Sequence, residues 1–154
     1  MGVFATKLRG LKDLNFQLEE LLPHRHPMLM LDSILEASTG RLLAEKVFQP
    51  DNYGVSEGHV LAGALIEAMA QAVAAIQGLA AASQGDLPPK GMLVGVEGLT
   101  VLAPVNLGRR LGILVEITRQ LRPFIMADGS IFQDGTLIAK GCLKFFVEGG
   151  PNEA

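Results

Sequence analysis

The segment from Gly63 or Ala64 to about Ala82 constrains the fold more than any other part of the sequence. It is rich in alanine, lacks proline and has few β-branched residues, so it predicts one long helix. Apolar residues occupy its whole circumference, whereas a surface helix keeps a polar face. Such a helix must be enclosed, and an antiparallel sheet curled around it would do so. We therefore expect an α+β domain built around one long central helix.

Strand-like segments lie on both sides of this helix. Two precede it, at 28–37 and 41–49, joined by a Ser-Thr-Gly turn at hairpin distance. Four follow it, at 91–102, 110–121, 124–134 and 135–148. Asp134-Gly135 is a strong hairpin signal, and the glycines at 91, 95 and 98 allow bulges in the strand that contains them.

We expect a single domain with a short segment at each end. We expect a leader at 1–14, one domain at 15–148 and a tail at 149–154. A short helix through 17–22, capped by Asp13 or Asn15 and stopped by Pro23, should open the domain.

Composition excludes several classes of protein. The chain has 154 residues, 49% of them hydrophobic, and a net charge of -3 with both signs mixed along it. This balance gives no basic face for nucleic acid. Cys142 is the only cysteine, so no internal disulfide is possible and a reducing, cytoplasmic setting is expected. Cys142 falls in a predicted strand, where an inert thiol is favoured over a nucleophile.

The most apolar window, 60–82, approaches the length of a membrane span. Glu67, Gln71 and Gln77 interrupt it, whereas a spanning helix needs roughly 20 predominantly apolar positions. We expect no membrane span, and residues 1–16 have no apolar core of signal-peptide length.

Glu67 is the unusual residue of the predicted helix. In GHVLAGALIEAMAQ, residues 58–71, one histidine stands before the helix and one glutamate sits inside it. A carboxylate costs free energy to bury among apolar groups, which favours a functional role. A structural alternative is a glutamate bonded in the core or exposed at a dimer interface, where Gln71, one turn along the same face, would help to satisfy it.

Four segments in order resemble the hotdog-fold 3-hydroxyacyl-[acyl-carrier-protein] dehydratases. They are LLPHRHPMLMLDSILE, GH followed by IEAMAQ, the strand and turn GMLVGVEGLTVLAPVNLGRRL, and DGTLIAKGCLKFF. The resemblance covers residues 15–148. It implies a hotdog fold, and a dimer or higher homo-oligomer whose sheets join edge to edge. The implied substrate is a 3-hydroxyacyl thioester on the phosphopantetheine of acyl carrier protein or on CoA, with no other cofactor.

The resemblance also implies the catalytic residues. His59 and Glu67 match the motif positions of the base and the acid, which in the family come from opposite protomers. Histidine suits removal of the proton next to the thioester carbonyl, and a carboxyl group that keeps its proton in apolar surroundings suits the departing hydroxyl. Backbone N–H groups near Gly63 and Ala64 would polarise the thioester oxygen, and Gln71 would support Glu67.

One departure from the family keeps other functions open. Glu67 follows His59 by only eight positions, and a longer proline- and glycine-rich stretch is usual. A hotdog thioesterase, with Glu67 activating water, is one alternative. A non-catalytic acyl-binding subunit that partners an active homologue is another, and the short loop favours it. A structural reading of His59 is a loop histidine that caps or packs.

The sequence PHRHP contains two more histidines. His24 and His26 lack a third ligand at useful spacing, so we expect no metal site. Structural packing is the favoured role for both, with Arg25 in a fixed ion pair.

Overall fold

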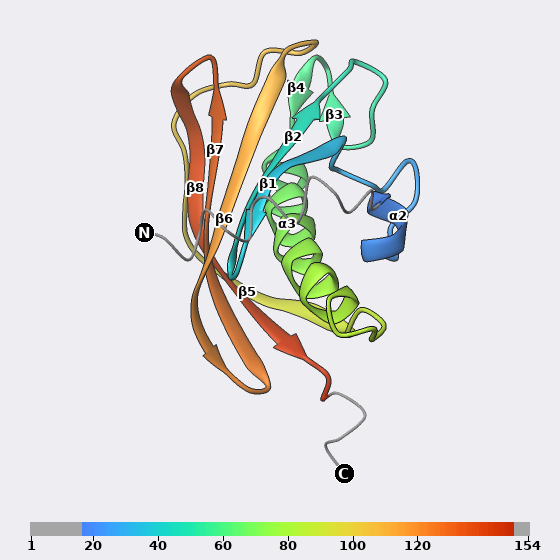
Figure 1. Ribbon diagram of the computed structural model, residues 1–154. Coiled ribbons are helices and arrows are strands. Elements are labelled where there is room, and N and C mark those ends of the chain that lie inside the picture. The colour runs from blue at the N-terminus through green and yellow to red at the C-terminus, as the bar shows by residue number, and fades with distance from the viewer. Residues whose placement is uncertain (1–16, 150–154) are drawn as a thin grey trace.

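A computed structural model describes residues 17–149 (Figure 1). In chain order its elements are α2 (Leu18–Leu21), β1 (Ser33–Ser38), β2 (Arg41–Val47), β3 (Val55–Ser56), β4 (His59–Val60), α3 (Ala62–Ala82), β5 (Gly91–Val101), β6 (Arg110–Leu121), β7 (Phe124–Gln133) and β8 (Thr136–Val147). The predicted leader, the proposed caps Asp13 and Asn15, and most of the predicted tail lie outside the described residues.

Six strands form one antiparallel sheet in the order β1-β2-β6-β7-β8-β5. The sheet curves around α3, and α2 lies on the other side of that helix (Figure 1). Buried side chains of the sheet, such as Ile113, Val115 and Leu143, pack with Leu65, Met69 and other residues of α3 in one core. The predicted α+β class and hotdog architecture are confirmed.

The predicted hairpin turn and the predicted strand irregularities are both found in the structure. Asp134 and Gly135 both have positive φ, 51° and 76°, and form the two-residue turn between β7 and β8. The register of β5 against β8 shifts between Leu93 and Gly95 and again between Glu97 and Thr100. The predicted bulges in this strand are therefore present.

The first predicted strand begins later than expected. The apolar run from 28 contributes to the sheet only from Ser33, and residues 28–32 are not in a strand. A small hairpin of β3 and β4 interrupts the predicted loop before α3. Neither difference changes the order of the main elements.

The enclosure of α3 by its own chain is incomplete. Ten of its residues are buried, but the stripe Ile66, Glu67, Ala70, Ala74 and Gln77 remains half-buried, at the spacing of one helix face. By length and composition alone α3 would pass as a membrane span, a test that a core helix also passes, and 56% of the tested window is buried here.

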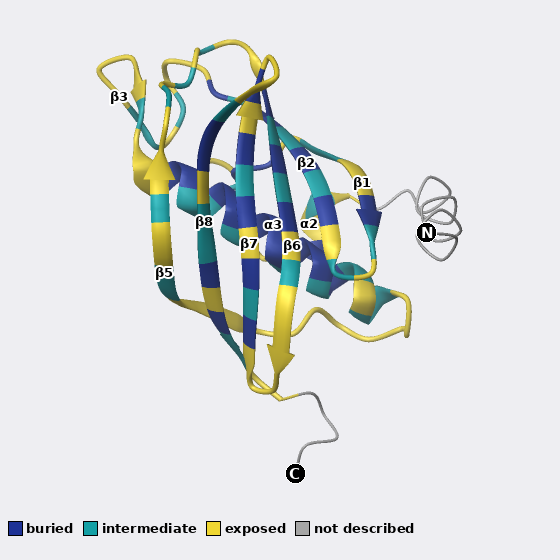
Figure 2. Cartoon of the chain, turned by 90° about the vertical axis from the view of Figure 1, so that its left-hand side faces the viewer, coloured by how far each residue is buried: buried dark blue, intermediate teal, exposed yellow. Residues whose placement is uncertain are grey.

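Strand β5 is an open edge. Among the described residues it pairs only with β8, and it is exposed along most of its length (Figure 2). Met92, Val94 and Val101 are among its exposed large hydrophobic side chains. An exposed apolar edge strand offers unpaired backbone groups to another strand.

Candidate active site

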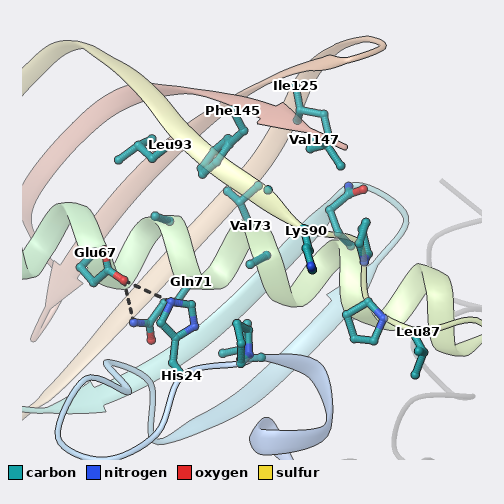
Figure 3. Close-up of a pocket in the computed structure, with 18 of the residues that line it drawn as sticks. His24, Glu67, Gln71, Val73, Leu87, Lys90, Leu93, Ile125, Phe145 and Val147 are labelled. Atoms are coloured by element: carbon teal, nitrogen blue, oxygen red, sulfur yellow. Dashed lines mark hydrogen bonds and ion pairs between the residues drawn. The ribbon is translucent and has the colours of Figure 1, made fainter. Parts of the chain in front are cut away.

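A cavity of about 670 Å³ lies along the half-buried stripe of α3. Apolar side chains from α3 and from strands β5, β7 and β8 form its walls, namely Val73, Leu93, Ile125, Phe145 and Val147. His24, Glu67 and Gln71 gather at one end, and Leu87 and Lys90 lie at the other (Figure 3). The cavity is a mostly apolar channel with polar side chains at its ends, which is the usual make-up of a small-molecule site.

Glu67 presents its carboxyl group at the polar end of this cavity. Its Oε1 accepts a hydrogen bond from Nε2 of Gln71 at 2.9 Å and lies 3.4 Å from Nε2 of His24. The side chain is 34% exposed, so within one chain it is not buried in the core. The cost of burying Glu67 is therefore smaller than its apolar helix suggested, and its role as the acid stays a prediction.

Gln71 is the buried support of the site. It is 1% exposed, and its amide makes two further hydrogen bonds to one segment of main chain. Its Oε1 accepts from the Met30 N–H at 2.7 Å, and its Nε2 donates to the Met28 carbonyl oxygen at 2.8 Å. The predicted approach of Gln71 to Glu67 is present, and Gln71 also ties the chain after α2 to the central helix.

His24 reaches Glu67 because the segment around it is anchored on both sides. Leu21 and Leu22 are 2% exposed and belong to the core. Arg25 folds its guanidinium group back onto the carbonyl oxygens of Glu19, Leu22 and His24. The expectation of an ion pair for Arg25 was therefore wrong among the described residues. Glu19 lies in the single-turn helix α2, and Leu22 and His24 follow it, so their carbonyl groups need donors from outside the helix.

The interpretation of His24 as a packing residue missed its contact with Glu67. Its side chain is 28% exposed, so one part of the ring faces the cavity while Nδ1 is buried. Positions 24 and 67 have no local pattern in common, and only the folded chain brings them together. The available signal was the isolated carboxylate of α3, which required a partner from elsewhere in the sequence.

His59 lies away from this polar group in the single chain. It is exposed on β4, opposite Ser56, and is not among the residues that line the cavity. The predicted pairing of His59 with Glu67 joins opposite protomers, so a single chain does not test it. His59 as the base stays a prediction.

Gly63 and Ala64 occupy the first turn of α3, as expected. The Ala64 N–H donates to the Leu61 carbonyl oxygen at 3.0 Å, in a turn at the start of the helix. Gly63 is exposed, and a Cβ built there meets no atom within 4 Å. Neither residue lines the cavity, and their role as oxyanion donors stays a prediction.

Cys142 sits on a different part of the sheet. Burial raises the pKa of its thiol, and the carboxylates of Asp128 and Glu97, on the two neighbouring strands, raise it further. A raised pKa keeps the less reactive thiol form. Residues 17–149 hold no group of three or more histidine, cysteine, aspartate or glutamate side chains placed to bind a metal ion.

The sequence matches known dehydratases over most of its length. Residues 16–153 match the profile of the ApeP-like family, described as ApeP dehydratase. A 3-hydroxyacyl-[acyl-carrier-protein] dehydratase FabZ of Symbiobacterium thermophilum is 33% identical over 82% of this chain and 91% of its own length. The FabZ of Myxococcus xanthus is 36% identical over 79% of this chain and 82% of its own.

Solved structures share the fold. A chain of the dehydratase heterocomplex ApeI:P from Xenorhabdus doucetiae superposes with a TM-score of 0.79, at 23% identity, over 87% of this chain and 92% of that one. A hypothetical thioesterase protein with coenzyme A from Streptococcus pneumoniae gives a TM-score of 0.60, at 22% identity, over 76% of this chain and 85% of that one. At these identities the likeness concerns the fold alone.

Proposed function

This chain belongs to the ApeP-like dehydratase family, and from that membership we propose that it removes water from 3-hydroxyacyl thioesters to give trans-2-enoyl thioesters. The observation that carries the proposal is Glu67, a carboxyl group held by side-chain donors at the end of an apolar channel. Such a channel suits an acyl chain, and the carboxyl group suits the hydroxyl group that leaves.

The two roles balance in one elimination. His59, supplied by a second protomer, removes the proton on the carbon next to the thioester carbonyl. The electron pair of that C–H bond forms the double bond while the C–O bond at the next carbon breaks. Glu67 gives its proton to the departing oxygen, which leaves as water. Imidazolium and carboxylate remain, and the proton passes back from His59 to Glu67 through water before the next turnover.

The proposed carrier is acyl carrier protein, because the curated relatives carry that carrier in their names. CoA thioesters share the phosphopantetheine arm and are the alternative. The proposed pathway is fatty-acid or polyene-type synthesis in the cytoplasm. These points rest on the relatives and not on the contacts of this chain.

We further propose that the working form is a dimer, with β5 of each protomer joined edge to edge. The exposed apolar side chains on β5 and the half-buried stripe of α3 support this assembly. Joined sheets would bring a second chain to the open side of the Glu67 cavity. The dimer can consist of two copies of this chain, and pairing through β5 would also allow dimers to associate further.

A second candidate function is that of a subunit paired with an active homologue. The short connection between His59 and Glu67 favours it. A structural relative is itself described as a dehydratase heterocomplex. In this reading Glu67 and its channel come from this chain, and the base comes from the other subunit.

The decisive experiment measures enoyl thioester formation beside thiol release, with 3-hydroxyacyl thioesters on acyl carrier protein and on CoA. We expect reversible hydration and dehydration, loss of both in Glu67→Gln and His59→Ala, and little free thiol. Glu116→Gln removes an exposed carboxylate on β6, away from the cavity, and should behave as wild type.

Other results would redirect the assignment. Thiol release that survives His59→Ala would indicate a thioesterase. An inactive, folded homodimer that gains dehydratase activity when mixed with a homologue would identify the paired-subunit form. Full activity in Glu67→Gln would contradict the proposed mechanism.

A further inference from the structure

We propose that His24 is a positioning residue for the acid: together with Gln71 it fixes Oε1 of Glu67, so that Oε2 is the oxygen that gives its proton to the substrate. The inference rests on the proposed dehydration and adds to it a residue from the same protomer as Glu67. The supporting contacts are those of Glu67 Oε1.

Both neighbouring side-chain nitrogens approach the same oxygen. Gln71 Nε2 donates to Oε1 at 2.9 Å, and His24 Nε2 lies 3.4 Å from that atom. A protonated carboxyl group has one oxygen that accepts and one that carries the hydrogen. The N–H of Gln71 makes Oε1 an acceptor, and His24 Nε2 stands at ion-pair distance from the same atom. The proton therefore resides on Oε2, whose hydrogen is free for the hydroxyl of the substrate.

The other ring nitrogen of His24 indicates which tautomer makes this contact. Its Nδ1 is buried and has no hydrogen-bond partner among the described residues. An N–H at Nδ1 would be a buried donor with no acceptor, which costs free energy, and it would leave Nε2 with no hydrogen to give to Oε1. The tautomer with its hydrogen on Nε2 avoids that cost, and Nε2 is the atom that faces Glu67.

The two supports reach Glu67 from different parts of the fold. Gln71 is one turn along α3 from Glu67, and its hydrogen bonds to Met28 and Met30 fix its amide plane. His24 comes from the segment after α2, and its ring lies next to the Gln71 amide beside the carboxyl group (Figure 3). Two donors from two elements restrict rotation of the carboxyl group more than either alone, which is the requirement for a positioned acid.

The segment does not depend on the His24 ring for its place. Leu21 and Leu22 in the core, the carbonyl contacts of Arg25 and the bonds from Gln71 all anchor it. Removal of the ring should therefore leave the fold intact. A positioning role for His24 therefore predicts a variant that folds normally and loses activity, whereas a packing role predicts a variant of lower stability.

Three variants test the proposal in the assembly that shows dehydratase activity. His24→Leu removes the donor and keeps an apolar side chain. His24→Gln restores an N–H the same number of bonds from the main chain as Nε2 of histidine. His26→Leu is the matched control, an exposed histidine two positions along the same segment. Each is measured for kcat, KM and thermal midpoint.

We expect His24→Leu to lower kcat by about ten- to a hundred-fold, the usual effect of a slightly misplaced catalytic group, with KM changed by less than about two-fold. His24→Gln should recover most of kcat, and His26→Leu should match wild type. In a Glu67→Asp background, whose shorter carboxyl group cannot meet both donors, His24→Leu should add little further loss, because coupled residues are not additive.

The inference is overturned if His24→Leu keeps the wild-type kcat while Glu67→Gln is inactive. It is also overturned if His24→Gln fails to recover any activity, or if the losses of His24→Leu and Glu67→Asp multiply. A wild-type protein that forms no enoyl thioester in any assembly would instead refute the proposed function, and the inference with it.

Discussion

Gly78 of α3 and Leu21 of α2 are in main-chain contact. A Cβ built on Gly78 would stand 2.8 Å from the Leu21 carbonyl oxygen and 3.2 Å from its Cα. No side chain other than hydrogen fits between the two helices at this point. This approach places the end of α2, and the His24 segment that follows it, directly on the central helix.

Gly78→Ala should therefore destabilise the protein, although alanine is the better helix former by about 1 kcal/mol. The added methyl group meets backbone, which cannot move aside as a flexible side chain would, and overpacking of this kind costs about 1–3 kcal/mol. Urea unfolding measures the change. Gly63→Ala is the control in the same helix, where a Cβ meets nothing, and it should leave stability equal or raised. Gly78→Ala at or above wild-type stability would contradict the contact.

Gln71→Leu should lower stability and disorder the site together. The Met30 N–H and the Met28 carbonyl would lose their bonds to the amide, and each buried group left unpaired costs on the order of 1–3 kcal/mol. Gln77→Leu, at a half-buried position on the same helix, should change stability by less than about 0.5 kcal/mol. Chemical denaturation of both variants decides the matter, and equal effects would argue against the role of Gln71.

Val94→Lys should weaken the proposed dimer. Val94 is half-exposed on the open edge of the sheet, and a lysine there opposes pairing with another strand. Light scattering across a dilution series would detect the shift toward monomer. Leu121→Lys, an exposed position at the end of β6, is the control and should leave association unchanged. A wild-type protein that is monomeric at all concentrations would refute the dimer itself.

Elements with a strong local signal were predictable from the sequence. The alanine-rich segment without proline forms α3 within two residues of its expected start. Asp134-Gly135 closes the last hairpin because both residues accept positive φ. In these cases the cause lies within a few neighbouring residues, so a pattern in the sequence is sufficient.

Residues 28–32 show where such a pattern fails. Their apolar run indicated a strand, yet the N–H of Met30 and the carbonyl of Met28 bond to the side chain of Gln71 and not to a neighbouring strand. A glutamine more than forty positions away competes for the backbone, and no local pattern contains it. The position of His24 has the same origin, since packing between α2 and α3 sets it.

Because of its place in the sheet, β5 can pair only after the rest of the sheet has been synthesised. This strand is made directly after α3, but its neighbour in the sheet is β8, the last strand of the chain. Until β8 leaves the ribosome, the strand that β5 pairs with in the folded sheet is missing, and β5 cannot join that sheet. The surface proposed for association therefore requires β8 in place, and we expect copies truncated before β8 not to associate.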